Sequence, residues 1–250
     1  MLDKDMREKL KFLKMDWLKG NWEDVLKDAA KKKCSYQRLL EEIIGNEYEL
    51  RWERARQARL ERAKIPEIFV IETYPFERQP KLNKKLVMQL HDSLSFLHEN
   101  QQLVLVGPTG CGKTGLGTSF LVNAINKGYR GYFIEFNALM GQLYRSRADH
   151  SERKLLKRLG DYDVLLVDEL GYKGGEEEAT GLFLDLIKLR AKRNATILTS
   201  QLGFDEWGSF LHSNHLASGL MDRVTEQCTI FNMKDCASLR PKNIIYATEK

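Results

Sequence analysis

Residues 107–114 read Gly107-Pro108-Thr109-Gly110-Cys111-Gly112-Lys113-Thr114. The stretch matches the pattern G-x-x-x-x-G-K-[ST], in which a glycine-rich loop surrounds phosphate groups with backbone N–H groups. It follows the apolar run 102–106 and precedes a helical pattern over 113–126. A strand, a loop and a helix in this order are the context that a phosphate-binding loop requires. The segment therefore predicts a P-loop nucleotide-binding domain.

The residue types in this loop are those that triphosphate binding requires. Glycines let backbone N–H groups approach phosphate oxygens where a Cβ atom would intrude. Lys113 would place a positive charge between the β- and γ-phosphates, and the Thr114 hydroxyl would be a ligand of Mg²⁺. We therefore expect ATP and Mg²⁺ as cofactors. The residues expected to hold the nucleotide are Gly107, Pro108, Thr109, Gly110, Cys111, Gly112, Lys113, Thr114 and Gly115.

Short apolar runs alternate with helical patterns from residue 102 onward, which is typical of a parallel sheet. The expected strands are Leu103–Val106, Gly131–Phe136, Val164–Val167, Thr196–Thr199 and Cys228–Phe231, and Ile244–Tyr246 also reads as extended. The expected helices cover 83–98, 113–126, 137–158, 176–192 and 215–225. Parallel strands joined by crossover helices predict an α/β domain with helices on both faces of the sheet.

Two adjacent acidic residues, Asp168 and Glu169, end one of the apolar runs. Ligands of open α/β sheets bind at the carboxyl ends of the strands, where such side chains would lie. Asp168 would hold Mg²⁺, and Glu169 would orient and polarise the attacking water. A small-molecule kinase does not need the second carboxylate, whereas an ATP hydrolase does, so the pair favours hydrolysis.

The first quarter of the chain is basic and helical. Residues 1–64 carry 17 Lys and Arg against 13 Asp and Glu, and contain no proline. Apolar spacing predicts several helices, one ending at Gly45 and the next running over 47–64. The last of these places Arg51, Arg54, Arg59 and Arg62 along roughly one side. Such a side fits either a solvated surface or contact with a polyanion.

Three prolines within 66–80 predict a linker, because proline disfavours helix for itself and for the preceding residue. The expected organisation is a helical N-terminal domain at 1–64, a linker at 65–82 and an ATPase domain at 83–250. Four scattered cysteines without a C-x-x-C pair favour a reduced, cytoplasmic protein. No apolar stretch is long enough for a membrane span, and the charged first residues do not form a secretory signal.

Beyond the loop, Val164–Tyr172 reads VLLVDELGY, Thr199–Gly208 reads TSQLGFDEWG, and an Asp-Arg pair stands at 222–223. Together with the loop, these stretches resemble the IstB family, the ATP-binding helper proteins of a class of bacterial insertion sequences. The resemblance runs from about residue 48 to residue 240. It implies a P-loop ATPase of the AAA+ group, close to the helicase loader DnaC.

The resemblance implies roles for residues outside the loop. Gln201 would be the polar sensor beside the γ-phosphate, where the family usually has Asn, and Ser200 is an alternative. Arg223 would reach the ATP of a neighbouring subunit, and Arg240 would contact phosphate in its own subunit. Only 27 residues follow Arg223, too few for the helical lid of most AAA+ proteins. The resemblance thus implies a site that a second copy completes, and hence an ATP-dependent homo-oligomer.

Two aromatic residues in the linker, Tyr74 and Phe76, match an aromatic-rich segment of the family. They would either contact the adenine base or anchor the linker on the core. The sequence leaves both readings open.

The family implies an ATP-dependent, DNA-binding regulator of transposition that assembles on double-stranded DNA and recruits a partner transposase. The side chains expected to neutralise DNA phosphates without reading bases are Arg51, Arg54, Arg56, Arg59, Arg62, Lys188, Arg190, Lys192 and Arg193. A DnaC-like loader of a replicative helicase is the alternative, because it shares every nucleotide motif. The basic segment at 51–62 favours transposition. A small-molecule kinase is disfavoured by Glu169, by Arg223 and by the missing lid.

Overall fold

The computed structural model describes residues 2–171, 177–211 and 214–240, and the chain divides into two compact units, Met1–Ala58 and Arg59–Lys250. The division falls inside a helix, earlier than the domain end expected at residue 64. Tyr172 of the VLLVDELGY stretch and the extended segment expected at Ile244–Tyr246 lie outside the described residues.

The first unit is built from α1 (Lys4–Phe12), α2 (Asp16–Lys32) and most of α3 (Tyr36–Ala63). Leu10, Leu18 and Val25 form its small core, against which α3 packs Leu39 and Ile43. The buried Glu47 carboxylate accepts a hydrogen bond of 2.8 Å from the Leu18 backbone N–H. An acidic group at this point satisfies a backbone donor in the first turn of α2, which no carbonyl of the helix itself can do.

Helix α3 continues through Gly45, so the helix end expected there is wrong. Glycine inside a helix costs about 1 kcal/mol relative to alanine. On either side of Gly45, Ile43 packs on the core of the first unit and Glu47 bonds to α2. We infer that these contacts hold the backbone helical in spite of the glycine.

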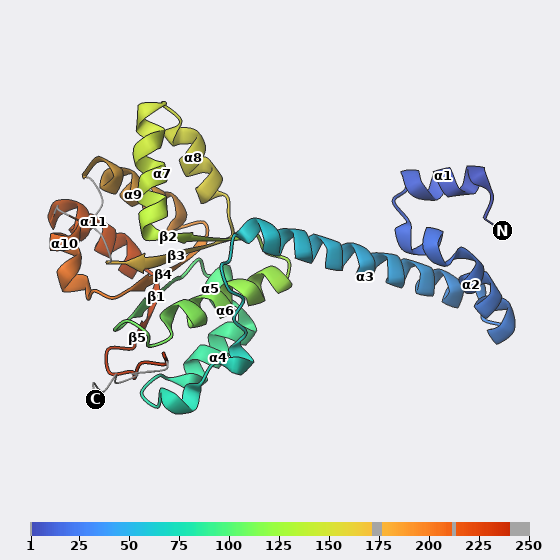
Figure 1. The fold of residues 1–250 in the computed structure, drawn as a ribbon, viewed down its shortest axis with the longest axis horizontal. Helices are drawn as coiled ribbons and strands as arrows, with labels where there is room; N and C mark the ends of the chain where they lie inside the picture. The colour runs from blue at the N-terminus through green and yellow to red at the C-terminus, as the bar shows by residue number, and fades with distance from the viewer. Residues whose placement is uncertain (1, 172–176, 212–213, 241–250) are drawn as a thin grey trace, which may run out of the picture. The chain divides into compact units, whose positions relative to one another are not determined.

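The second unit contains a five-stranded parallel sheet with the order β2-β3-β4-β1-β5 (Figure 1). All five strands expected from residue 102 onward are present within the described residues. Their bounds are β1 Gln102–Val106, β2 Gly131–Glu135, β3 Val164–Leu170, β4 Ala195–Ser200 and β5 Cys228–Asn232. The prediction of an α/β domain is confirmed.

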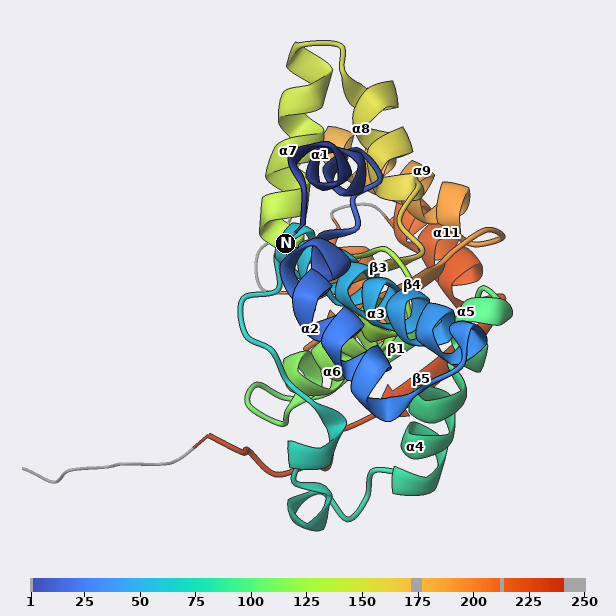
Figure 2. The same ribbon diagram turned by 90° about the vertical axis from the view of Figure 1, so that its right-hand side faces the viewer.

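Alternate residues of the strands face two separate cores. Leu103 and Leu105 of β1 pack in one core with the helices on one side of the sheet, and Val104 and Val106 pack in the other. The first group of helices is α4 (Lys84–Ser93), α5 (Ser95–His98) and α6 (Lys113–Asn126). The second group is α7 (Phe136–Ala148), α8 (Glu152–Gly160), α9 (Glu177–Arg190), α10 (Trp207–Phe210) and α11 (Asn214–Thr225). Figures 1 and 2 show the two groups on opposite faces of the sheet.

The single helix expected at 137–158 is two helices, α7 and α8. Between them the Asp149 carboxylate accepts hydrogen bonds from the backbone N–H and the hydroxyl of Ser151. His150 between them has a φ of 54°. Side chains that bond locally to the backbone compete with helix formation, which explains the break.

The proline-containing segment 65–82 packs on the second unit. It forms two 3₁₀ turns, Ile71–Thr73 and Phe76–Arg78, and buries Ile71 and Leu82 in the core beneath α4 and α6. This segment is therefore an integral part of the second unit. Among the described residues no helix combines the length and apolar character that crossing a membrane demands.

Candidate functional site

A cavity of about 610 Å³ lies at the carboxyl ends of β1, β3 and β4, within the range of roughly 300–1,000 Å³ typical of small-molecule sites. Its walls come from the glycine-rich loop, the two strand ends, the segment 66–75 and residues 239–240. The predicted residues that line it are Thr109, Gly110, Gly112, Lys113, Thr114, Gly115, Asp168, Glu169, Gln201 and Arg240. The other predicted loop residues, Gly107, Pro108 and Cys111, complete the loop without lining the cavity.

The loop glycines are needed for the backbone path and for close packing. Gly110 and Gly112 have φ values of 82° and 97°, in the left-handed region that favours glycine. A Cβ on Gly110 would lie 2.6 Å from the Ser238 hydroxyl, and one on Gly112 would lie 2.8 Å from a methyl group of Leu239. The Leu239 backbone N–H also donates to the Gly110 carbonyl at 2.8 Å. The segment 238–240 therefore packs directly on the loop and carries Arg240 to the cavity.

Lys113 begins α6 and lies inside the loop. Its ammonium group is buried and donates to the carbonyls of Gly107 at 2.7 Å and Pro108 at 2.8 Å. Burial lowers the pKa of Lys113, and the nearby Cys111, Asp168 and Glu169 oppose this shift. A helix N-terminus and a buried ammonium at one point form an anion-binding arrangement.

Asp168 and Thr114 form a set of oxygen ligands. The Thr114 hydroxyl donates to the Asp168 carboxylate at 2.9 Å, and the buried Thr199 hydroxyl donates to the same carboxylate. Burial raises the pKa of Asp168, and these two hydrogen bonds act in the opposite direction. Carboxylate and hydroxyl oxygens are the hard donors that Mg²⁺ prefers. The pair therefore fits a magnesium ion at the edge of a triphosphate site.

Glu169 has a left-handed backbone, with a φ of 62°. A bulge interrupts the pairing of β3 with β4 between Val167 and Leu170, and the Glu169 N–H donates to the Thr199 hydroxyl at 3.0 Å. A left-handed non-glycine residue costs roughly 1–2 kcal/mol, and bulges redirect side chains beside active sites. Burial raises the pKa of Glu169, and the charges of Asp168 and Glu135 add to the shift. Both effects suit a carboxylate that accepts a proton.

The predicted sensor and arginines occupy different places. The Gln201 side-chain oxygen accepts a hydrogen bond of 3.0 Å from the Thr109 hydroxyl at the loop. Ser200, the alternative, bonds instead to the backbone of Leu202. Arg240 reaches the cavity, whereas Arg223 lies on α11, 3.2 Å from Glu226, and is not among the cavity residues. The fold thus brings Gln201 and Arg240 to the loop and leaves Arg223 outside.

The cavity also contains residues that were not predicted from the sequence, among them Thr199, Glu135 and Phe69. Thr199 connects Asp168 to the backbone of Glu169, and Glu135 ends β2 at the register position opposite Asp168. Polar residues at the last positions of parallel strands are the signal that would have found both. Phe69 is identified only by its three-dimensional position, because its ring lies 3.5 Å from a Cβ built on Gly115.

The two linker aromatics differ in their surroundings. Tyr74 lines the cavity, and its hydroxyl is 3.4 Å from the Cys111 carbonyl. Phe76 packs on the core and against Tyr74, with ring centroids 4.9 Å apart. The first position suits contact with a ligand, and the second suits anchoring of the linker.

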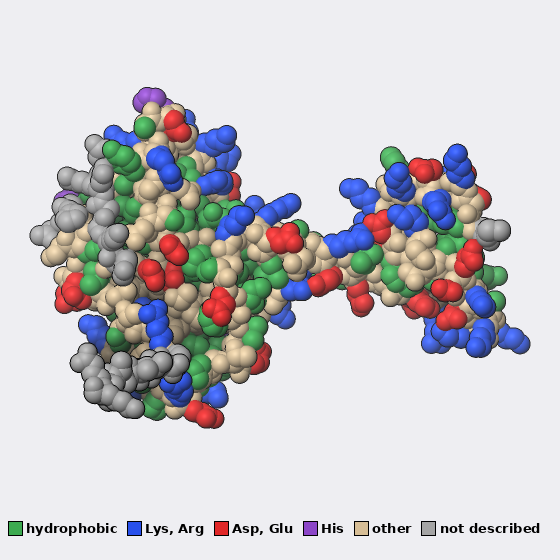
Figure 3. Space-filling view, viewed as in Figure 1, with side chains coloured by type: hydrophobic (Ala, Val, Ile, Leu, Met, Phe, Trp, Pro, Cys, Tyr) green, Lys and Arg blue, Asp and Glu red, His purple; other side chains and the backbone are tan. Residues whose placement is uncertain are grey.

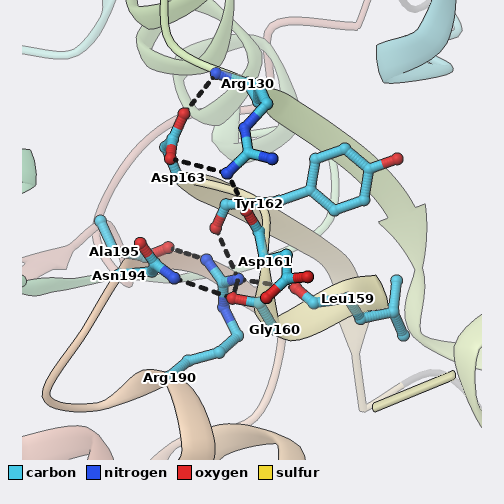
Figure 4. A network of polar contacts seen from close by, with 9 residues as sticks. All are labelled: Arg130, Leu159, Gly160, Asp161, Tyr162, Asp163, Arg190, Asn194 and Ala195. Carbon is cyan, nitrogen blue, oxygen red and sulfur yellow. Dashed lines mark hydrogen bonds and ion pairs between the residues drawn. The ribbon is translucent and has the colours of Figure 1, made fainter. Parts of the chain in front are cut away.

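Arg190 is not available to DNA, so its assignment as a DNA contact is wrong. Its side chain is fully buried, and its guanidinium donates to five oxygens around the amino ends of β3 and β4. These acceptors are the carbonyls of Leu159, Gly160, Tyr162 and Ala195 (Figure 4) and the hydroxyl of Thr196. Burial lowers the pKa of Arg190 to about 9, which leaves the group charged at neutral pH. It connects the end of α8 to β4.

Three other basic residues expected to contact DNA also bond within the chain; Arg51 and Arg54 remain exposed, and Arg56 is half-buried. The Arg51 guanidinium donates to the carbonyls of Leu13 and Lys14. Arg54 pairs with Asp16 at 2.5 Å, and Arg56 pairs with Glu53. These contacts give Arg51 and Arg54 a structural role in the first unit. In the second unit Lys188 is exposed beside Asp185, and Lys192 lies 3.7 Å from Glu226.

Comparison with known proteins identifies relatives across nearly the whole chain. A family model described as IstB-like ATP binding protein matches residues 8–247. The chain is 32% identical over 222 residues to the insertion sequence IS21 putative ATP-binding protein of Pseudomonas aeruginosa, covering 89% of this chain and 83% of that protein. It is 29% identical over 224 residues to the IS232 putative ATP-binding protein of Bacillus thuringiensis subsp. berliner, covering 90% and 89%.

Among solved structures, the crystal structure of DnaI is similar in fold. It has a TM-score of 0.53 and 17% sequence identity, over 60% of this chain and 85% of that chain. At this identity the likeness concerns the fold alone. With the sheet order and the loop described above, it places the second unit among P-loop domains of the AAA+ type.

Proposed function

The chain belongs to the IstB-like family of insertion-sequence ATP-binding proteins, and from this membership we propose that it is an ATP-dependent, DNA-binding regulator of transposition. ATP-loaded copies assemble on duplex target DNA and recruit or activate a partner transposase. The observation that carries the proposal is the cavity in which Lys113, Thr114, Asp168 and Glu169 meet. Their arrangement supports Mg-dependent ATP binding and hydrolysis.

In this proposal each cavity residue has a defined task. Lys113 neutralises the β- and γ-phosphates, and Thr114 with Asp168 holds Mg²⁺, which would offset the charge of the phosphates. Glu169 orients the attacking water and accepts its proton. Gln201, already bonded to Thr109 at the loop, senses the γ-phosphate, and Arg240 contacts phosphate in the same subunit.

The position of Arg223 outside the cavity of its own chain supports assembly. Its side chain is 40% exposed, and its ionic partner among the described residues is the similarly exposed Glu226. Exchange of this contact for a neighbour's phosphate would therefore cost little. A trans-acting arginine contributes roughly 10³–10⁵ in rate in P-loop enzymes. We therefore propose that isolated subunits hydrolyse ATP slowly.

DNA contact is proposed for the N-terminal region, residues 1–64, and for the basic residues around the end of α9. The candidates that remain after the exclusion of Arg190 are Arg51, Arg54, Arg56, Arg59, Arg62, Lys188, Lys192 and Arg193. They would bind phosphates and leave the bases unread, so affinity falls steeply with salt.

The test is electron microscopy and light scattering of the full chain with an ATP analogue, Mg²⁺ and duplex DNA. We expect DNA-bound multimers for the wild type and for Lys127→Ala, an exposed lysine remote from the loop, and none for Lys113→Ala. Monomers only, under saturating nucleotide, would contradict assembly. Monomers that bind a replicative helicase tightly would instead favour the loader function.

A further inference from the structure

A second hollow opens on the second unit at the amino end of β2. It has a volume of about 320 Å³ and includes Gly131, Asp161 and Tyr162 in its walls. Strand β2 runs from Gly131 at this hollow to Glu135 at the nucleotide cavity, so the two sites lie at opposite ends of the same strand. Four arginines from three parts of the chain line the hollow: Arg59, Arg62, Arg130 and Arg158.

The positive charge of this hollow is only partly offset by its own carboxylate, Asp161. Arg130 donates to the Asp161 carbonyl at 2.6 Å and lies 3.5 Å from the Asp163 carboxylate (Figure 4). Arg158 donates to a neutral group, the Gln142 side-chain oxygen, at 3.1 Å. Within the described ranges no carboxylate lies in ion-pair distance of Arg62 or Arg158. Several guanidinium groups gathered around one hollow create a positive potential that an anion would stabilise.

A neighbouring hollow of about 250 Å³ continues this basic surface. It shares Arg158 with the first and adds Arg145 and Lys154, together with Asp149. Asp149 already accepts two hydrogen bonds from Ser151. We call the basic residues of both hollows the arginine track: Arg59, Arg62, Arg130, Arg145, Lys154 and Arg158. Figure 3 shows Lys and Arg side chains gathered over α8 and the C-terminal end of α3 on this side of the second unit.

The shape of the track favours a large ligand with repeated anionic groups. Single small anions bind in enclosed sites, whereas Arg130 is 62% exposed and the two hollows follow one another along the surface. Guanidinium groups match phosphate oxygens by paired hydrogen bonds. Duplex DNA presents one phosphate charge per roughly 1.7 Å of its axis. A series of arginines on open surface therefore suits a DNA backbone.

We propose that the arginine track binds successive phosphates of duplex DNA, an inference that rests on the proposed DNA-dependent function. It adds Arg130, Arg145, Lys154 and Arg158 to the DNA surface and assigns Arg59 and Arg62 to the same contact. The track reads no bases, and it lies at the end of β2 remote from the nucleotide.

The experiment measures DNA affinity of the full chain against salt concentration, with an ATP analogue bound. The variant is Arg62→Gln with Arg158→Gln, because neither side chain holds a backbone group in the described structure. Its matched control is Lys85→Gln with Lys127→Gln, two exposed lysines outside the track. Each lost phosphate contact lowers the slope of log K against log salt by about 1. We expect the slope to fall by about 2 for the track variant and to stay unchanged for the control. Circular dichroism and the thermal midpoint check that both variants fold.

The outcomes separate the track from the proposed function. If the wild type binds DNA and the track variant has the same salt dependence as the control variant, the arginine track does not bind DNA. The proposed DNA-dependent function is then unaffected. If the wild type does not bind DNA at all, both fail. A calorimetric titration of the analogue-loaded chain with inorganic pyrophosphate tests the other source of phosphate. Micromolar binding that the track variant loses would mean a small-anion site and would overturn the DNA assignment, whereas absence of binding at millimolar pyrophosphate supports it.

Discussion

The two ends of the sheet use buried positive charge in different ways. At the amino ends of β3 and β4, Arg190 donates to five oxygens of its own chain. At the carboxyl ends, Lys113 is also buried and donates to two carbonyls and, at 3.9 Å, to the Cys111 sulfur, but it lines an open cavity. Nearby, Glu169 is held in a left-handed backbone. A buried cation enclosed by acceptors of its own chain is a structural element, and one that lines open space beside local strain is a binding group.

Replacement of Arg190 tests the structural end of this contrast. Arg190→Met would remove the guanidinium donor from three backbone carbonyls and the Thr196 hydroxyl, whereas the Gly160 carbonyl keeps its hydrogen bond from Asn194. We therefore expect the free energy of unfolding to fall by about 3 kcal/mol or more. Urea denaturation followed by circular dichroism measures the change.

The control is Arg193→Met, an exposed arginine just after α9, which should alter stability by no more than about 0.5 kcal/mol. If Arg190→Met were as stable as the wild type but bound DNA more weakly, Arg190 would be a DNA contact after all. The buried cations at the two ends of the sheet would then not differ in function.

Replacement of Lys113 tests the binding end. Lys113→Ala removes a charge-assisted contact to the phosphates, so ATP affinity should fall by about 100-fold. Fluorescent nucleotide titration measures it, with Lys127→Ala as the control. Stability should change much less than for Arg190→Met, because Lys113 holds only its own loop. An unchanged affinity would mean that the triphosphate lies elsewhere.

Local sequence patterns correctly predicted the features of the fold that depend only on residues close together in the sequence. The glycine-rich loop, the five strands and the Asp168-Glu169 pair each follow from spacing within a short stretch. The failures concern contacts between distant segments. Arg190 has the charge of a DNA contact, and only the return of the chain at Leu159 and Ala195 buries it. Gly45 reads as a helix end until the packing of α3 on α2 is known.

The unpredicted site residues have the same origin. Thr199 lies next to Asp168 because β3 and β4 are neighbours in the sheet. The order of strands in the sheet cannot be predicted from the sequence of either strand alone. Phe69 reaches the cavity because the segment 65–82 folds back on the second unit. Its prolines indicate a break in helix but not the surface on which the segment packs.

The raised pKa of Asp168 predicts a pH-dependent effect of its replacement. Because the folded-state pKa is raised by burial above the ordinary value of 3.8, ionisation of this carboxyl destabilises the fold. Asp168→Asn should therefore be more stable than the wild type at pH 7. The gain should shrink as the pH falls through the folded pKa and disappear below about 3.8, where the wild-type carboxyl is protonated in both states. Urea midpoints at several pH values measure it. A gain that is constant over pH would rule out the ionisation cause.

The smallest expected effect concerns the backbone of Glu169. A left-handed glutamate costs roughly 1–2 kcal/mol, and glycine removes this cost but adds about 1 kcal/mol of chain entropy to the unfolded state. Glu169→Gly should therefore be about 0.5 kcal/mol more stable than Glu169→Gln, which keeps the strained φ while losing the same charge. Both should fail to hydrolyse ATP if this carboxylate accepts the proton from water. The comparison of two uncharged variants isolates the backbone, because any electrostatic gain is common to both. Equal stability would mean that the bulge at Val167–Leu170 holds Glu169 without strain, and the carboxyl ends of the strands would then differ from the Arg190 end only in the open cavity beside the buried cation.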